Sequence, residues 1–95
     1  MQNYTLTGKI TKLFPITDLG YMDIEVAIPK TSFSLLCRVS PQNSHYLNGA
    51  MAGDIVCLAG IPMYSHAGHL TIIDFVKVAS IALIFATAQT PDILQ

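Results

Sequence analysis

Two β-branched runs joined by a short polar segment place the strongest constraint on what this chain folds into. The first run extends from Asp54 to Pro62 and follows directly on Gly53, and the second extends from His69 to Val78. The segment between them contains Gly68, which supplies the backbone freedom needed to reverse the chain. Alternating β-branched residues on either side of a glycine-containing turn are typical of a β-hairpin. The sequence therefore predicts a protein built from antiparallel strands.

Three further strands are predicted upstream of this hairpin, from Tyr4 to Phe14, from Tyr21 to Ile28 and from Phe33 to Val39. Each alternates between apolar and polar residues, which is the period of a strand with one buried face. Gly8 lies in the middle of the first strand and predicts a bulge or a sharp bend there. The residues expected to face inward are Tyr4, Leu6, Gly8, Ile10, Met22, Ile24, Val26, Ile28, Phe33, Leu35, Cys37 and Val39.

A short helix is predicted between the third and fourth strands. Ser40 suits an N-cap position and Pro41 the first helical position, so the helix is expected to run from Pro41 to about Leu47. Tyr46, Leu47 and Met51 are then candidates to close one end of a barrel. Five strands with one helix between the third and the fourth follow the order of the oligonucleotide/oligosaccharide-binding fold, or OB-fold. The predicted fold class is therefore an all-β, five-stranded Greek-key barrel.

The composition predicts one domain that hides apolar surface in an assembly. The chain has 95 residues, of which 52% are hydrophobic and 12% are charged, against a charged share of about 25% in ordinary proteins. We expect residues 1–78 to form the barrel and residues 79–95 to form an apolar extension that packs on it or on a partner subunit. This extension either continues the fifth strand or forms a helix, and periodicity does not decide between the two. A homo-oligomer, dimeric or higher, is the expected state.

Charge, cysteines and the terminal segments bound the environment of the protein. The formal net charge is −1, so any nucleic-acid binding would depend on a few cations gathered on one face, or on stacking. Cys37 and Cys57 lie among apolar neighbours, which favours buried thiols over a disulfide. The run from Ile81 to Ala88 is shorter than the ~20 residues of a membrane helix. With no recognisable signal peptide at the start, a cytoplasmic protein without membrane contact is expected.

Catalytic and metal-binding patterns are weak in this sequence. The acids are scattered, and Asp23 and Glu25, which share a strand face, are expected to pair with Lys9 and Arg38 across strands. A metal site would need more ligands than the histidines provide, because Cys37 and Cys57 belong to the barrel wall. A hairpin histidine is therefore a solvated polar residue, or one whose ring stacks on a base. The three histidines are His45, His66 and His69. The sequence therefore predicts a protein that is not an enzyme and holds no metal or cofactor.

From Asn3 to about Val78, the chain resembles bacterial single-stranded-DNA-binding proteins and the related primosomal replication protein B. The opening Asn3-Tyr4-Thr5-Leu6-Thr7-Gly8-Lys9-Ile10 is similar to their first strand, and Asp54-Ile55-Val56-Cys57-Leu58-Ala59-Gly60 to their fourth. The resemblance implies an OB-fold module that binds single-stranded nucleic acid, DNA rather than RNA, in replication, repair or plasmid and phage processing. An alternative is an OB barrel that serves protein–protein interaction and assembly without nucleic acid.

In such modules the ligand lies across strands two and three and is held by the loops that join strands one to two and four to five. Cations on these elements would meet phosphates, and aromatic rings would stack on bases, each contributing ~1–3 kcal/mol. For Phe14, Tyr21 and Tyr64, edge packing in the fold is an equally good explanation. Core packing is expected for Phe33 and Phe75. The candidate contacts are Lys9, Lys12, Phe14, Tyr21, Arg38, Tyr64, His66, His69 and Lys77.

Overall fold

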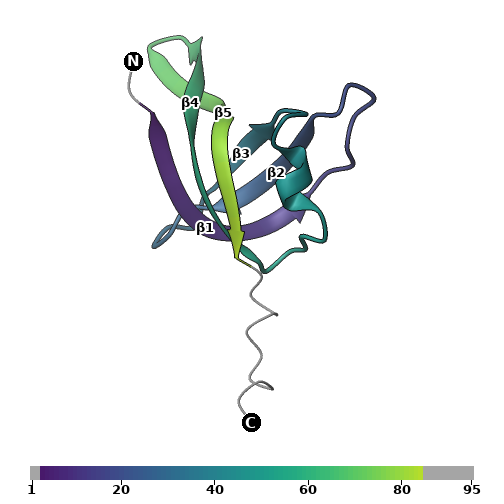
Figure 1. Cartoon of the computed structure of the whole chain (residues 1–95). Coiled ribbons are helices and arrows are strands. Elements are labelled where there is room, and N and C mark those ends of the chain that lie inside the picture. Colours follow the sequence, from purple (N-terminus) through teal and green to yellow (C-terminus); the bar gives the residue numbers. More distant parts are fainter. Residues whose placement is uncertain (1–2, 85–95) are drawn as a thin grey trace.

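Five strands curl into a barrel in the computed structural model, which describes residues 3–84 (Figure 1). A single 3-10 helix, η1, lies between the third and fourth strands and covers one side of the barrel. The elements are β1 (Tyr4–Leu13), β2 (Met22–Ala27), β3 (Ser34–Val39), η1 (Ser44–Leu47), β4 (Ile55–Ala67) and β5 (Leu70–Ile84). Among the described residues there is no helix with the length and hydropathy required to span a membrane.

The order of the strands around the barrel is β1-β2-β3-β5-β4, and β4 pairs with β1 to close it. All neighbours are antiparallel except β3 and β5, which run parallel over the pairs Cys37–Val76, Arg38–Lys77 and Val39–Val78. This closed, five-stranded Greek-key arrangement is that of an OB-fold barrel, and the predicted fold class is confirmed.

Alternate residues of β1, β2 and β3, and of the barrel portions of β4 and β5, fill the barrel interior, as the sequence pattern predicts. The side chains of Ile24, Val26 and Val39 are wholly buried, and Ile10 retains 1% exposure. At Gly8, a Cβ atom would collide with the carbonyl oxygen of Ala27, so glycine is required by close approach of the backbones. The bulge expected near Gly8 occurs slightly later in the strand, between Ile10 and Lys12.

Several expected core positions face solvent instead. Phe33 precedes β3 in the turn after β2 and is 69% exposed. Cys57 is exposed on the outside of β4, because Val56 and Leu58 point inward and alternation turns the residue between them outward. Phe75 is outside for the same reason, as its neighbour Val76 is buried. Cys37 is buried as predicted, and both thiols are free.

The segment between β3 and β4 is less helical than predicted. Ser40 accepts backbone hydrogen bonds from the amides of Asn43 and Ser44, which forms a turn instead of an N-cap. Only Ser44–Leu47 forms a helix, and Leu47 alone of the three proposed plugs is buried. Tyr46 and Met51 are each 52% exposed.

Beyond the barrel wall, β4 and β5 continue as a two-stranded ribbon, here called the arm (residues 61–75), which projects from the barrel in Figure 1. Within the described residues, β1 pairs with β4 only as far as Gly60, and β3 pairs with β5 only from Val76. Residues 70–84 form one strand, so residues 79–84 of the expected extension continue β5. Residues 85–95 of that extension lie outside the described residues.

Candidate nucleic-acid interface

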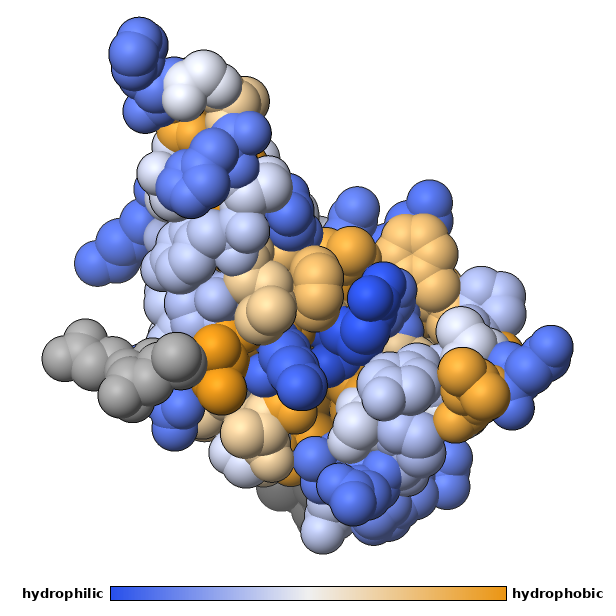
Figure 2. All heavy atoms as spheres, turned by 90° about the horizontal axis from the view of Figure 1, so that it is seen from above, coloured by the Kyte–Doolittle hydropathy of each residue, from blue (hydrophilic) through white to orange (hydrophobic). Residues whose placement is uncertain are grey.

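A groove of about 1190 Å³ lies on the outer wall of the barrel. Its floor comes from the ends of β2 and β3 and from the middle of β5, and its rims come from the β1–β2 loop, the turn after β3 and the base of the arm. In Figure 2, hydrophobic and strongly hydrophilic residues lie close together in the middle of this side of the molecule. The lining residues are Thr17, Asp18, Leu19, Tyr21, Asp23, Arg38, Ser40, Pro41, Gln42, Asn43, Met63, Phe75, Lys77, Val78 and Ala79.

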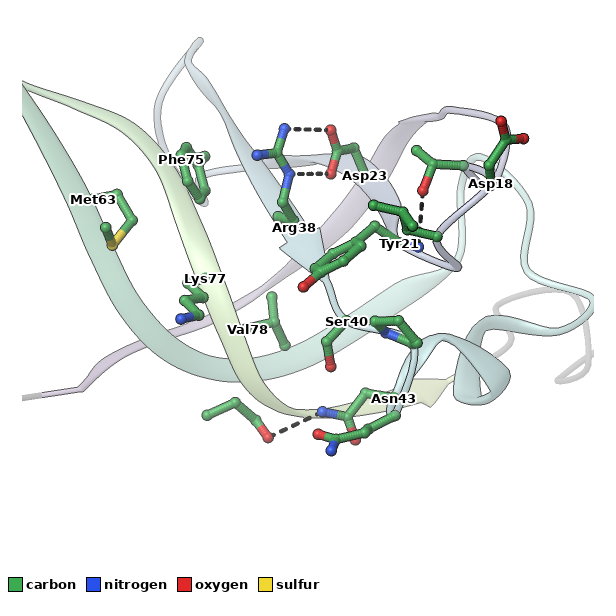
Figure 3. Close-up of a pocket in the computed structure, with 15 residues that line it drawn as sticks. Asp18, Tyr21, Asp23, Arg38, Ser40, Asn43, Met63, Phe75, Lys77 and Val78 are labelled. Atoms are coloured by element: carbon green, nitrogen blue, oxygen red, sulfur yellow. Dashed lines mark hydrogen bonds and ion pairs between the residues drawn. The ribbon is translucent and has the colours of Figure 1, made fainter.

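The centre of the groove is a fixed guanidinium group. Arg38 donates hydrogen bonds from Nε and Nη2 to the two carboxylate oxygens of Asp23, at 3.0 and 3.1 Å. The guanidinium carbon also lies 4.6 Å from the ring centroid of Phe75, so the cation lies over an aromatic ring. Figure 3 shows these three side chains converging from β2, β3 and β5. Two-sided support of this kind holds the planar fork in one orientation.

The register of the strands explains why these charges meet. Asp23 lies opposite Arg38 in the antiparallel β2–β3 pair, and Arg38 lies opposite Lys77 in the parallel β3–β5 pair. All three face outward because their neighbours Ile24, Val39 and Val76 alternate into the core. The β2–β3 and β3–β5 pairings therefore produce the row of charges along the groove.

The β1–β2 loop is fixed by its own hydrogen bonds. The backbone amide of Tyr21 donates to Oγ1 of Thr17 at 3.0 Å, and the amide of Thr17 donates to the carbonyl of Tyr21 at 2.8 Å. Gly20 has a φ of +88°, and a Cβ there would lie 3.1 Å from Cβ of Pro41. A glycine thus lets this loop turn while packing against the turn after β3, which places Tyr21 at the groove.

The electrostatics of the groove are balanced. Two cations, Arg38 and Lys77, face two carboxylates, Asp18 and Asp23. The hydrogen bond that Arg38 donates to Asp23 raises the pKa of Arg38, which keeps the guanidinium charged. Among the described residues Asp23–Arg38 is the one ion pair, so Lys77 is the groove cation whose charge no carboxylate pairs. A polyanion would gain little net Coulomb attraction here and would depend on stacking.

Of the two cross-strand pairings expected for the acidic face, one is formed. Asp23 pairs with Arg38, whereas Glu25 accepts a hydrogen bond from Oγ1 of Thr11 at 3.3 Å. Lys9 lies opposite Ile55 on β4 and makes no ion pair within residues 3–84. The cation that shares a register position with Glu25 is Lys12.

Three of the nine candidate contacts line the groove, namely Tyr21, Arg38 and Lys77. The other six lie elsewhere on the surface. Lys12 and Phe14 form a cation–π pair at 4.9 Å at the end of β1, and Lys9 lies on β1 facing β4. Tyr64, His66 and His69 lie on the arm or at its turn, where Tyr64 is 56% exposed and Nδ1 of His66 is 3.3 Å from Oγ1 of Thr71.

Phe75 and Met63 line the groove but were not among the predicted contacts. They lie opposite each other on β5 and β4, and a strict alternation from the buried Val76 and Val78 would have placed Phe75 beside Lys77 on the outer face. The core position expected for Phe75 follows from its residue type, whereas its position in the alternation determines that it faces outward.

The described part of the chain contains no group of three or more side chains that could hold a metal ion. Comparison with protein-family models, with curated proteins and with solved structures gives no match. The function has to be inferred from the groove itself.

Proposed function

We propose that this barrel binds single-stranded nucleic acid, DNA rather than RNA, in the groove. The observation that carries the proposal is the position and chemistry of the groove, which lies over β2 and β3 and offers two aromatic rings, Tyr21 and Phe75, beside Arg38 and Lys77. OB barrels use the same face and the loop between their first two strands for oligonucleotides. Rings on such a face stack on bases with little regard to sequence, each contributing ~1–3 kcal/mol.

The balanced charge of the groove makes a specific prediction for salt dependence. If Lys77 supplies the single phosphate contact, the slope of log K against log salt is about −0.7, because each neutralised phosphate of a single strand contributes about that amount. Raising salt from about 50 to 200 mM then weakens binding only about threefold. A strongly basic interface would lose several orders of magnitude over the same range.

Fluorescence anisotropy with a labelled oligothymidylate of about 11 nucleotides tests the proposal, since single barrels cover ~4–16 nucleotides. Tyr21→Ala and Phe75→Ala are each expected to weaken binding about 5-fold or more, and Lys77→Ala is expected to flatten the salt dependence. Tyr64→Ala and Lys9→Ala remove the same groups outside the groove and serve as matched controls. Absence of binding at low salt, or equal losses in the controls, contradicts the proposal.

A second function, assembly through a protein interface, is favoured by the arm. Its exposed apolar side chains include Met63, Tyr64, Leu70 and Ile72, of which Leu70 is 66% exposed. A second copy of the chain is the proposed partner, since a homo-oligomer would cover this surface. Light scattering coupled to gel filtration tests it: Leu70→Lys with Ile72→Lys is expected to convert the oligomer to a monomer, and a wild-type monomer contradicts it.

A further inference from the structure

The way in which Arg38 is held leaves one of its edges for a ligand. Nε and Nη2 donate to Asp23, and the guanidinium carbon lies 4.6 Å from the ring centroid of Phe75. Within the described part of the chain no group hydrogen bonds to Nη1, and the Arg38 side chain is 42% exposed. In Figure 3 the Nη1 atom points away from Asp23, on the side of Phe75. The edge formed by Nη1 and Nη2 therefore presents two parallel N–H donors to the groove.

The charge around this edge disfavours a phosphate as its partner. The carboxylate of Asp23 lies within hydrogen-bonding distance of the guanidinium, so a phosphate on the neighbouring edge would be placed close to another anion. A neutral group with two adjacent acceptors meets the same donors without that repulsion. Nucleobase edges are such groups. A base that stacks on Tyr21 or Phe75, as proposed above, would bring its edge close to Arg38.

Only some bases offer two adjacent acceptors. Guanine has O6 and N7, and cytosine has O2 and N3, which an unpaired strand leaves open. Adenine and thymine place a donor beside each acceptor: the N6 amino group beside N7 in adenine, and N3–H beside O4 in thymine. A fixed arginine fork therefore distinguishes the first pair of bases from the second.

Resting on the proposed function, we infer that Arg38, oriented by Asp23 and Phe75, reads one base of the bound strand and prefers guanine or cytosine. Lys77 then contacts the backbone, and Tyr21 provides stacking that is independent of sequence. The groove would combine a general grip with one selective position.

The test compares oligothymidylates of about 11 nucleotides that carry one central substitution, all at one salt concentration. A central dG or dC is expected to tighten binding about 5-fold or more over dA and over the all-thymidine strand, the low end for a bidentate arginine because the site is partly exposed. A central 7-deaza-dG lacks N7 and is expected to return to the all-thymidine affinity. Equal affinities for all four strands overturn the inference but leave the proposed function standing, whereas no binding of any strand removes both.

Two variants separate base reading from a structural role. Arg38→Lys keeps the charge but loses the planar fork, so the ratio of the affinities for the dG and dC strands to the all-thymidine affinity is expected to fall to about one. Asp23→Asn leaves the arginine charge unpaired, so all-thymidine affinity is expected to rise and the salt slope to steepen by about 0.7. Circular dichroism and thermal unfolding confirm that each variant is folded. Retention of the preference in Arg38→Lys, or an unchanged salt slope in folded Asp23→Asn, overturns the assignment.

Discussion

Strands β4 and β5 run through both the barrel and the arm, and yet they obey different constraints in the two regions. In the barrel, β4 and β5 each have a neighbouring strand on both sides, and their inward residues, such as Val56 and Val76, are wholly buried. In the arm, the strands pair only with each other among the described residues, and both faces meet solvent. The same strand geometry thus supports a closed core in one region and an open ribbon in the other. Stability is expected to reside in the barrel.

The largest expected difference concerns access to the barrel interior. Burial, together with the nearby charge of Asp23, raises the pKa of the Cys37 thiol to about 12. At pH 8 its thiolate fraction is therefore about a thousandfold below that of an ordinary thiol. Ellman's reagent is expected to label only Cys57 in the native protein and both cysteines in denaturant. In the Cys57→Ser variant only Cys37 remains. Rapid labelling of Cys37 in the native state of this variant would show that the barrel interior is open to the reagent.

The same shift makes stability depend on alkaline pH. Because the pKa of Cys37 is higher in the folded protein than the ~8.5 of an unfolded thiol, the folded state holds its proton more tightly. This contribution to stability is complete below pH ~8.5 and declines as the pH rises toward 12. Urea unfolding midpoints of the wild type and of Cys37→Ala, measured from pH 7 to 10, check the sign. The stability of the wild type is expected to fall more over this range than that of Cys37→Ala.

Truncation of matched isoleucines compares the two regions directly. Ile24→Ala opens a cavity in the core, where the side chain is wholly buried, and is expected to lower the free energy of unfolding by about 2–5 kcal/mol. Ile72 is 46% exposed on the arm, and Ile72→Ala is expected to change it by no more than about 0.5 kcal/mol. Urea denaturation measures both. Similar losses would mean that the arm is as much a part of the folding core as the wall.

The smallest expected difference concerns two glycines. Gly8→Ala would push Cβ against the Ala27 carbonyl, so a loss of about 1–3 kcal/mol is expected from overpacking. Gly68 lies at the arm turn with a φ of +66° and open space around it, so Gly68→Ala is expected to cost only about 1 kcal/mol of conformational strain. Thermal unfolding of the two variants ranks them. A greater loss for Gly68→Ala would place the critical constraint in the arm.

Much of the barrel could be predicted because strand alternation is a local property. The inward residues of β1 and β2 follow from it, and so does the outward position of Asp23 and Arg38. The arm is predicted only in part. The run from His69 to Val78 is strand as expected, whereas residues 63–67 are polar and mixed and form strand by pairing with β5 across the turn at Gly68 and His69. Bulges after Ala59 and Met63 also shift the register between β4 and β5.

The groove could not be predicted from the sequence, because its residues meet only in the folded structure. Nothing local to residues 38 and 77 indicates that they are neighbours, because they meet only through the parallel pairing of β3 and β5. The sequence predicts Tyr21 as a contact because it borders a loop that OB barrels use for ligands, and the structure places it in the groove lining. Lys12 and Phe14 lie beside the loop between β1 and β2, and Tyr64, His66 and His69 lie in the hairpin of β4 and β5. Their part in binding stays a prediction.

The parallel seam between β3 and β5 is short, with three registered pairs, and the groove lies across it. Parallel joints between distant segments carry a high entropic cost of closure and form slowly. A molecule that contacts both Arg38 and Lys77 bridges the two strands of this parallel pair. Occupancy of the groove and integrity of the whole cylinder are thereby thermodynamically linked, and each strengthens the other.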